Sequence, residues 1–372
     1  MKNTLKNIKK YPVIIFFGFV LYAISIGDLF SPVYERSDLE NRELAKFPKF
    51  SISSLMKNKY NADIETFTTD HFIGRNTWIS IKSVAESAIG KQENNGVVYG
   101  KGGYMFTKVL TPDYKQLDKN LKAVEKFMER HSDRTVTFMA VPTAPGVLTD
   151  LVYKDSPVVD SNYILEQGEN TVKSGKFLNI KQVLQEHRND YIYYRTDHHW
   201  TTYGAYYGYR EYLKSVGKTP KSIDDFKFNE AEDFFGTQYS KAKSYNRKAD
   251  VLSYIDCDAQ ITINDETDSI YDYSCLDTRD KYKMFLRGNY GFSSVKGSGK
   301  GKLLVVKDSY ANCLIPYLTG DYEQIDIYDL RYITEGLDKR IEEEDYDEIL
   351  FLYNCESLLT DSNLPKINLF NG

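Results

Sequence analysis

The clearest pattern of polar and apolar residues lies at the start of the chain. Four lysines among the first ten residues precede an uncharged, apolar stretch over residues 11–27. As a helix this stretch spans about 25 Å, the short end of the length that crosses a bilayer. The basic flank predicts a cytoplasmic tail over residues 1–10, a membrane anchor over residues 11–27 and an exported remainder. Ala23 and Ser25 have the spacing of a signal-peptidase site, so cleavage is the alternative. Both interpretations place the body of the protein outside the cytoplasm.

Residues 28–60 are polar and typical of a spacer, and residues 61–372 are expected to form one large domain. In that domain, helical and strand patterns alternate. The predicted helices cover residues 117–130, 180–187, 202–216, 310–318 and 336–343, and the predicted strands cover residues 135–141, 191–194, 303–306, 324–328 and 348–353. This alternation predicts an α/β fold with a mostly parallel sheet flanked by helices. The polar stretch over residues 217–302 interrupts it and is expected to be a partly β insertion.

Composition narrows the functional classes. A hydrophobic content of 41% predicts a folded chain, and a net charge of -5 gives no general attraction to nucleic acid. The four cysteines show no zinc-ligand spacing, so no metal is expected. Cys257 and Cys275 are compatible with a disulfide across a hairpin or with free thiols. The 31 tyrosines suit half-buried strands as well as sugar faces.

Two polar segments directly follow predicted strands, where ligands of α/β sheets collect. One contains Asp197 and His199, and the other contains Ser309. Residues two apart in an extended segment share a face, so Asp197 is expected to orient His199. A serine hydroxyl becomes a nucleophile when a base removes its proton and a third group fixes the base. Asp197, His199 and Ser309 therefore form a candidate catalytic set.

Several neighbours of this set have candidate roles. The backbone N–H of Ser309, at the start of a predicted helix, is a candidate oxyanion donor, and the Asn354 amide is the candidate second donor. Trp200 is a candidate substrate contact, although packing beneath the histidine is the favoured role. Ser309 as a simple helix cap is one alternative. Zinc binding by Asp197, His198 and His199 is another, which we disfavour because adjacent residues on a strand point to opposite faces.

The run Asp197-His198-His199-Trp200 resembles the signature of the DHHW proteins, a family related to the alginate O-acetyltransferases with an SGNH-hydrolase-like fold. Other segments resemble that family in the same order, over about residues 38–356: Glu40-Asn41-Arg42-Glu43-Leu44 with Phe47-Pro48, residues 67–75, Gly236-Thr237 before Tyr239-Ser240, and Asp308-Ser309. The motif order is permuted relative to ordinary SGNH esterases. The resemblance implies that Asp197 orients His199, that His199 is the general base and that Ser309 is the nucleophile. Lys307 stands where the family often has Gly, and its side chain is expected to narrow the turn or face the acceptor.

The resemblance implies an extracytoplasmic O-acetyltransferase with residues 61–372 as its catalytic domain, and the single membrane span predicted from charge and hydropathy fits this arrangement. The implied acceptor is a polysaccharide, and the implied acetyl donor is a multipass membrane O-acyltransferase. The chain has no Gly-rich phosphate loop, so no soluble acetyl-CoA site and no cofactor are expected. The alternatives are a carbohydrate acetyl-esterase with water as acceptor and a catalytically silent scaffold that binds polysaccharide.

Overall fold

The computed structural model describes residues 11–244, 247–333 and 336–369, so the basic tail predicted over residues 1–10 lies outside the described residues. The chain forms two compact units. Residues up to Lys91, with residues 243–245, make up the first, and residues 92–242 and 246–372 make up the second. The large unit therefore begins after residue 91, whereas the sequence suggests residue 61, because the helices over residues 59–88 belong with the preceding segment.

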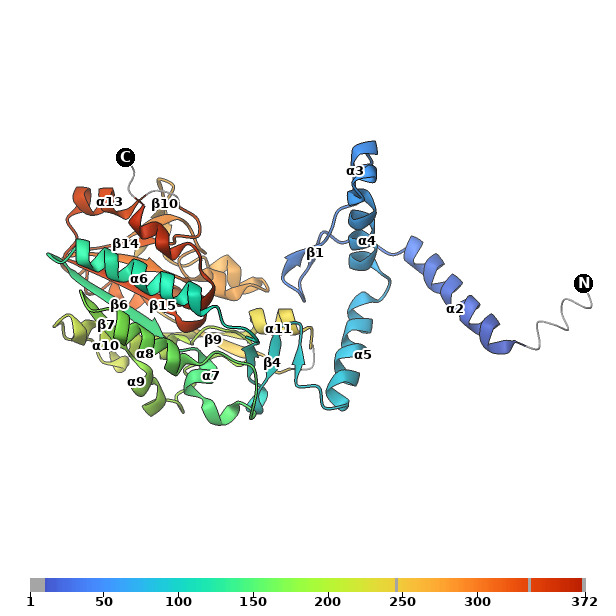
Figure 1. The fold of residues 1–372 in the computed structure, drawn as a ribbon, viewed down its shortest axis with the longest axis horizontal. Helices are drawn as coiled ribbons and strands as arrows, with labels where there is room; N and C mark the ends of the chain where they lie inside the picture. Colours follow the sequence, from blue (N-terminus) through green and yellow to red (C-terminus); the bar gives the residue numbers. More distant parts are fainter. Residues whose placement is uncertain (1–10, 245–246, 334–335, 370–372) are drawn as a thin grey trace, which may run out of the picture. The chain divides into compact units, whose positions relative to one another are not determined.

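The first unit is mainly helical (Figure 1). Its elements are α2 (Pro12–Leu29), β1 (Arg36–Ser37), β2 (Arg42–Glu43), α3 (Ile52–Met56), α4 (Lys59–His71) and α5 (Arg75–Ala88). Helix α2 has a mean hydropathy of 2.0 and no buried residue, so it is long and apolar enough to cross a membrane or to serve as a signal sequence. The side chains of Glu40 and Asp70 are buried, and the guanidinium groups of Arg42 and Arg75 neutralise them. Paired in this way, the buried charges fasten β2 to the helices.

The second unit is built on an eight-stranded sheet in the order β11-β10-β12-β14-β13-β15-β6-β7. The strands β14, β13, β15, β6 and β7 are parallel, and the others pair antiparallel. The strand bounds are β6 (Thr135–Val141), β7 (Lys176–Asn179), β10 (Gln260–Ile263), β11 (Glu266–Ser269), β12 (Phe292–Lys296), β13 (Lys302–Lys307), β14 (Gln324–Tyr328) and β15 (Glu348–Asn354). The mostly parallel α/β sheet predicted from the sequence is confirmed.

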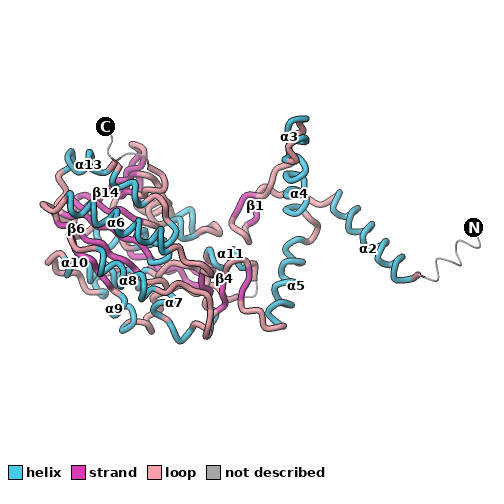
Figure 2. The backbone as a smooth tube through the Cα atoms, in the orientation of Figure 1, coloured by secondary structure: helices cyan, strands magenta, loops and turns pink. Residues whose placement is uncertain are grey.

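Helices and smaller strands surround this sheet (Figure 2). The helices are α6 (Tyr114–Arg130), α7 (Ala144–Val147), α8 (Ser161–Thr171), α9 (Lys181–Glu186), α10 (Thr202–Ser215), α11 (Thr237–Ala242), α12 (Ile315–Leu318), α13 (Leu337–Glu344) and α14 (Cys355–Thr360). The remaining strands are β3 (Glu93–Asn94), β4 (Val97–Tyr99), β5 (Met105–Thr107), β8 (Phe228–Phe234) and β9 (Asp250–Ile255).

Alternate side chains of the central strands enter two separate cores. Leu303 and Val305 of β13 pack with α10 and α12, whereas Leu304 and Val306 pack with α6 and α13. Because successive side chains of a strand point to opposite faces, a strand buried on both faces must be apolar throughout. The continuous apolar runs in the sequence reflect this burial, and they bring the strand ends to one edge of the sheet.

One predicted strand is wrong. Residues 191–194 are not a strand, because they form only an isolated bridge between Tyr193 and Trp200. The stretch over residues 217–302 is partly β, as expected, and its strands β10, β11 and β12 extend the central sheet.

Candidate active site

Ser309 lies at the carboxyl end of β13, in what we call the serine turn (residues 307–310). The Asp308 side chain accepts a hydrogen bond from the Tyr310 N–H at 2.8 Å and so caps the 3₁₀ helix Ser309–Cys313. Its other oxygen accepts from the backbone N–H of Asn354, also at 2.8 Å. Asp308 thus ties the ends of β13 and β15 together. Among the described residues, no acceptor is found for the Ser309 N–H, which leaves this donor for a ligand.

His199 belongs to an irregular segment, the histidine loop (residues 191–201). Its Nε2 lies 2.8 Å from the Oγ of Ser309, and its Nδ1 lies 2.5 Å from an oxygen of Asp197. The Asp197 and His199 side chains are almost completely buried. The structure therefore brings Asp197, His199 and Ser309 into one hydrogen-bonded chain. An imidazole placed in this way can take the serine proton, and the carboxylate fixes its tautomer.

The second oxygen of Asp197 is also occupied. It accepts from the backbone N–H of Thr237 at 2.7 Å and from the Thr237 hydroxyl at 3.0 Å. Burial raises the pKa of Asp197, but the adjacent His198 and His199 and these hydrogen bonds outweigh burial and hold the pKa well below its usual range. A methyl group on Gly236 would lie 2.2 Å from the Cβ of Asp197. The Gly236-Thr237 pair therefore packs directly against the carboxylate that is hydrogen-bonded to His199.

The buried Asp250, at the start of β9, determines the path of the histidine loop. One of its oxygens accepts from the N–H and the hydroxyl of Thr196, and the other accepts from the N–H of Arg195 and the hydroxyl of Tyr191. These bonds take up backbone donors that a strand would use in a sheet. The proximity of Asp197 and His199 therefore results from a turn, and not from the extended segment that the sequence suggests.

Tyr282 lies against the histidine. Its ring stacks on the His199 imidazole with centroids 3.9 Å apart and planes 11° apart, and its hydroxyl donates to the Ser309 carbonyl at 3.1 Å. Trp200 is fully buried, and its indole N–H donates to the Tyr310 carbonyl at 2.8 Å. Trp200 thus packs in the core beneath the site, where no substrate reaches it. No sequence pattern marks Tyr282, which lies in the irregular stretch before β12.

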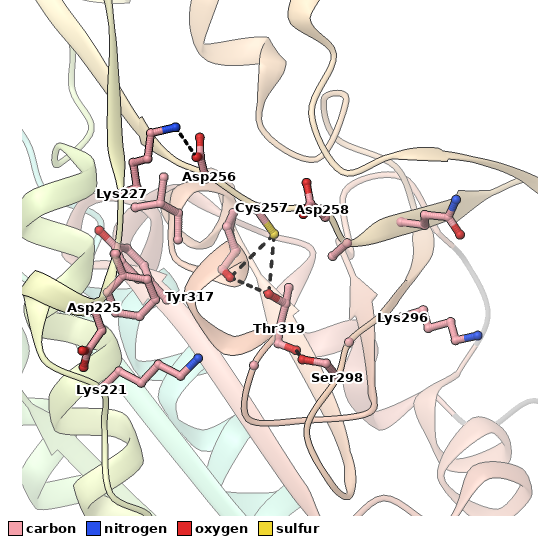
Figure 3. Close-up of a pocket in the computed structure, with 17 residues that line it drawn as sticks. Lys221, Asp225, Lys227, Asp256, Cys257, Asp258, Lys296, Ser298, Tyr317 and Thr319 are labelled. Carbon is pink, nitrogen blue, oxygen red and sulfur yellow. Dashed lines mark hydrogen bonds and ion pairs between the residues drawn. The ribbon is translucent and has the colours of Figure 1, made fainter.

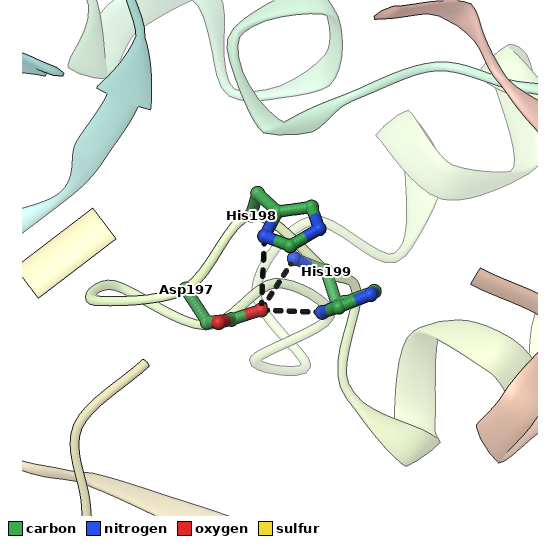
Figure 4. Close-up of side chains that lie close together, drawn as sticks. All are labelled: Asp197, His198 and His199. Atoms are coloured by element: carbon green, nitrogen blue, oxygen red, sulfur yellow. Dashed lines mark hydrogen bonds and ion pairs between the residues drawn. The ribbon is translucent and has the colours of Figure 1, made fainter. Parts of the chain in front are cut away.

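His198 also lies close to Asp197, as Figure 4 shows, with Nδ1 3.6 Å from the carboxylate oxygen. Candidate ligand atoms of Asp197, His198 and His199 all lie within 4.8 Å of one another, so the two histidines do not diverge as residues of a strand would. However, both ring nitrogens of His199 and both oxygens of Asp197 already have partners within the protein. Burial lowers the pKa of His198 to about 4, with a further contribution from His199.

The side chains of Asn354 and Lys307 both bond to groups within the protein. The Asn354 amide donates to Asp308 at 2.6 Å and to the Ser357 hydroxyl at 2.8 Å, and its oxygen caps α14. Both amide hydrogens are therefore used, which leaves none for an oxyanion. The Lys307 ammonium is buried, 2.8 Å from the Asn289 side-chain oxygen and 3.5 Å from Asp329. It points into the protein, and burial lowers its pKa to about 8.

A separate hollow of about 600 Å³ lies between α12 and the turns that flank β9 and β10 (Figure 3). None of the candidate catalytic residues lines it. The Cys257 thiol lies in its wall, 3.5 Å from the Thr319 hydroxyl, and Lys227 pairs with Asp256 at 2.7 Å. All four cysteines are free, so Cys257 and Cys275 form no disulfide in the structure.

Comparisons with known proteins agree with this architecture. The model of the family described as DHHW protein matches residues 85–328, more than half of the chain. A DHHW family protein from Eubacterium siraeum is 22% identical, with a TM-score of 0.66 over 75% of this chain and 97% of that chain. PatB1 of Bacillus cereus with a sulfonyl adduct is 16% identical, with a TM-score of 0.61 over 73% and 98%.

More distant similarity extends to the O-acetyltransferase domain of Pseudomonas putida AlgJ, which is 14% identical with a TM-score of 0.48 over 72% of this chain and 93% of that chain. No curated protein sequence matches the chain.

Proposed function

This chain belongs to the DHHW protein family, and from that premise we propose that it transfers acetyl groups through an acyl-enzyme on Ser309. The observation that carries the proposal is the buried hydrogen-bonded chain from Asp197 through His199 to Ser309, with distances of 2.5 and 2.8 Å. A helix-cap role for Ser309 would not require a histidine at its hydroxyl, because Asp308 already caps the helix.

In the first step, the Ser309 oxygen attacks the carbonyl carbon of an acetyl ester while His199 Nε2 takes the serine proton. The negative charge on the former carbonyl oxygen meets the free Ser309 N–H. The intermediate then expels the donor's alcohol, which takes the proton from His199, and an acetyl-serine remains. Asp197 stays ionised throughout, because its pKa is held well below the usual range.

In the second step, His199 takes the proton of an acceptor hydroxyl, whose oxygen attacks the acetyl carbon. The bond to Ser309 breaks, and the serine regains its proton. We propose a sugar hydroxyl of an exported or cell-surface polysaccharide as acceptor, supported by the family resemblance. A multipass membrane O-acyltransferase is the proposed donor, and α2 is proposed as a single-pass anchor that leaves the site outside the cytoplasm, supported by its apolar length.

Two measurements on the detergent-solubilised full chain test this function. Phenylmethanesulfonyl fluoride reacts with activated hydroxyls, and peptide mass spectrometry should find its adduct on Ser309 in the natural protein and none in His199→Ala. Incubation with 4-nitrophenyl acetate and oligosaccharides should then give acetylated sugar. Ser309→Ala should lower this rate by several orders of magnitude, whereas Ser298→Ala, a serine of the separate hollow, should leave it unchanged.

The outcomes separate the alternatives. Acetate release with no acetylated sugar would replace the transferase with an esterase. Normal polysaccharide acetylation in cells that carry Ser309→Ala would contradict both the transferase and the esterase. It would favour a scaffold that binds polysaccharide without catalysis.

A further inference from the structure

Residues 46–60, which we call the basic segment, differ in charge from the rest of the chain. The segment contains four lysines and no aspartate or glutamate, while the whole chain has a net charge of -5. The lysines are Lys46, Lys49, Lys57 and Lys59, and all are exposed. None of them pairs with a carboxylate among the described residues. Such a cluster attracts a surface of negative charge.

The same segment exposes large apolar side chains between its lysines. The exposed fractions are 65% for Phe47, 62% for Phe50, 71% for Ile52 and 84% for Met56. Single exposed apolar residues are ordinary, but four large ones within ten residues concentrate apolar surface in one short segment. Lysines interleaved with aromatic and aliphatic side chains are typical of segments that lie in the headgroup region of a membrane.

The exposure is a feature of an ordered segment. The Phe47 ring packs edge-on against Phe67 of α4 with centroids 5.2 Å apart, and Phe50 packs in the same manner against Tyr60. The Ser51 side chain accepts from the Ser54 N–H at 3.1 Å and caps α3. One edge of each phenylalanine is therefore held by α4, while most of its surface remains free for a partner.

From these observations we infer that the basic segment binds the surface of a lipid bilayer that carries anionic headgroups. The inference rests on the proposed placement of α2 in the membrane. Sixteen residues separate Leu29 from Lys46, a length that reaches at most about 60 Å when extended, so the segment can return to the surface from which α2 emerges. The phenylalanines and Met56 would enter the headgroup region, and the lysine ammonium groups would contact lipid phosphates.

Charge favours lipid over a protein partner. A protein groove for the apolar side chains would require matching carboxylates at four lysine positions, whereas a bilayer with anionic lipid supplies negative charge wherever the lysines fall. Each lysine near such a surface strengthens binding about fivefold, and the effect weakens with salt because the Debye length is about 8 Å at physiological ionic strength.

The test is hydrogen–deuterium exchange of the full chain reconstituted through α2 into nanodiscs of either phosphatidylcholine alone or a mixture with phosphatidylglycerol. We expect amides of residues 46–60 to exchange at least about fivefold more slowly in the anionic discs, and half-molar salt to remove the difference. A variant with Lys46, Lys49, Lys57 and Lys59 changed to Gln should lose the protection. The matched control changes four exposed lysines of the second unit, Lys115, Lys119, Lys126 and Lys154, to Gln and should retain it.

Equal exchange in both kinds of disc would overturn the inference. Protection in native membranes, but not in anionic discs, would also overturn it and assign the segment to a protein partner. Failure of the catalytic proposal is recognised separately, since Ser309→Ala should leave the exchange of residues 46–60 unchanged. Failure of the anchor proposal is recognised by a mature chain that lacks residues 11–27 and does not enter the discs.

Discussion

The serine turn is held by the sheet, whereas the histidine loop is held by side chains from other segments. Ser309 follows β13, which pairs with β14 and β15 and is buried on both faces. The histidine loop has only an isolated bridge and depends on Asp250, Thr237 and Tyr282. The regular structure fixes the position of the proposed nucleophile, while tertiary hydrogen bonds and packing fix that of the proposed base. Substitutions around the histidine loop should therefore lower activity more than they lower stability.

The largest effect is expected for Asp197→Asn. The variant keeps the size of the side chain but loses the negative charge that fixes the His199 tautomer, and we expect kcat/KM for ester cleavage to fall about 10⁴-fold. The matched control is Asp233→Asn, an exposed position, with activity unchanged. A loss smaller than tenfold, with the circular dichroism spectrum preserved, would show that Asp197 does not orient the base.

Gly236→Ala comes next. The added methyl group would lie 2.2 Å from the Cβ of Asp197, so the carboxylate must shift. A displacement of about 1 Å in such a site costs about 100-fold in rate, and we expect kcat to fall by that factor with little change in the unfolding midpoint. Gly18→Ala is the control, since a methyl group there meets nothing within 4 Å. Activity within twofold of the natural protein would mean that the backbone of residues 236–237 shifts and Asp197 keeps its position.

A smaller effect is expected at Tyr282. Tyr282→Leu removes both the stacked ring and the bond to the Ser309 carbonyl, and we expect kcat to fall about tenfold with KM unchanged. Tyr282→Phe keeps the ring and should recover most of the rate. If both variants lose the same activity, the hydroxyl and not the stack positions the site. If neither loses any, Tyr282 has only a packing role.

The smallest effect on rate is expected for Lys307→Met, which acts on stability. Burial lowers the pKa of Lys307 to about 8 from the usual value of 10.5, so the unfolded chain holds the proton more tightly between these values. The free energy of unfolding should therefore rise with pH across that window, by about 2 to 3 kcal/mol from pH 7 to pH 10 for this group. Urea unfolding at the two pH values should show this rise in the difference between the free energies of unfolding of the natural protein and of Lys307→Met. An equal response of both proteins would mean that Lys307 is not titrating in the interior.

The contrast between the sheet and the histidine loop also explains which elements could be predicted from the sequence. Strands β6 and β14 have the bounds that their apolar runs predict, because burial on both faces leaves a continuous signal. Residues 191–194 have a strand-like composition but form no strand, because Asp250, more than fifty residues away, bonds their loop. Propensity holds no information about such a distant partner. Strand β7 (Lys176–Asn179) has only two apolar residues between a lysine and an asparagine, so no sequence pattern predicts it.

Some residues of the candidate site can likewise be predicted from the sequence, and others cannot. Placement after a strand suggested Ser309, and it also placed Asn354 at the correct edge of the sheet. The actual partners of the Asn354 amide, Asp308 and Ser357, depend on side-chain geometry that no spacing reveals. The family resemblance includes Gly236-Thr237 but assigns the pair no role, and no periodicity in the surrounding sequence marks Tyr282.

The groups around His199 also appear in a fixed order during synthesis. Asp197 and His199 are made first, then Thr237, then Asp250, then Tyr282, and Ser309 is made last, 110 residues after the histidine. A chain that has just been extended past His199 therefore carries the imidazole and Asp197 without the other supporting partners and without the serine. A truncated product that ends before Ser309 lacks the proposed nucleophile, so we expect that only a chain extended beyond this residue forms the acyl-enzyme.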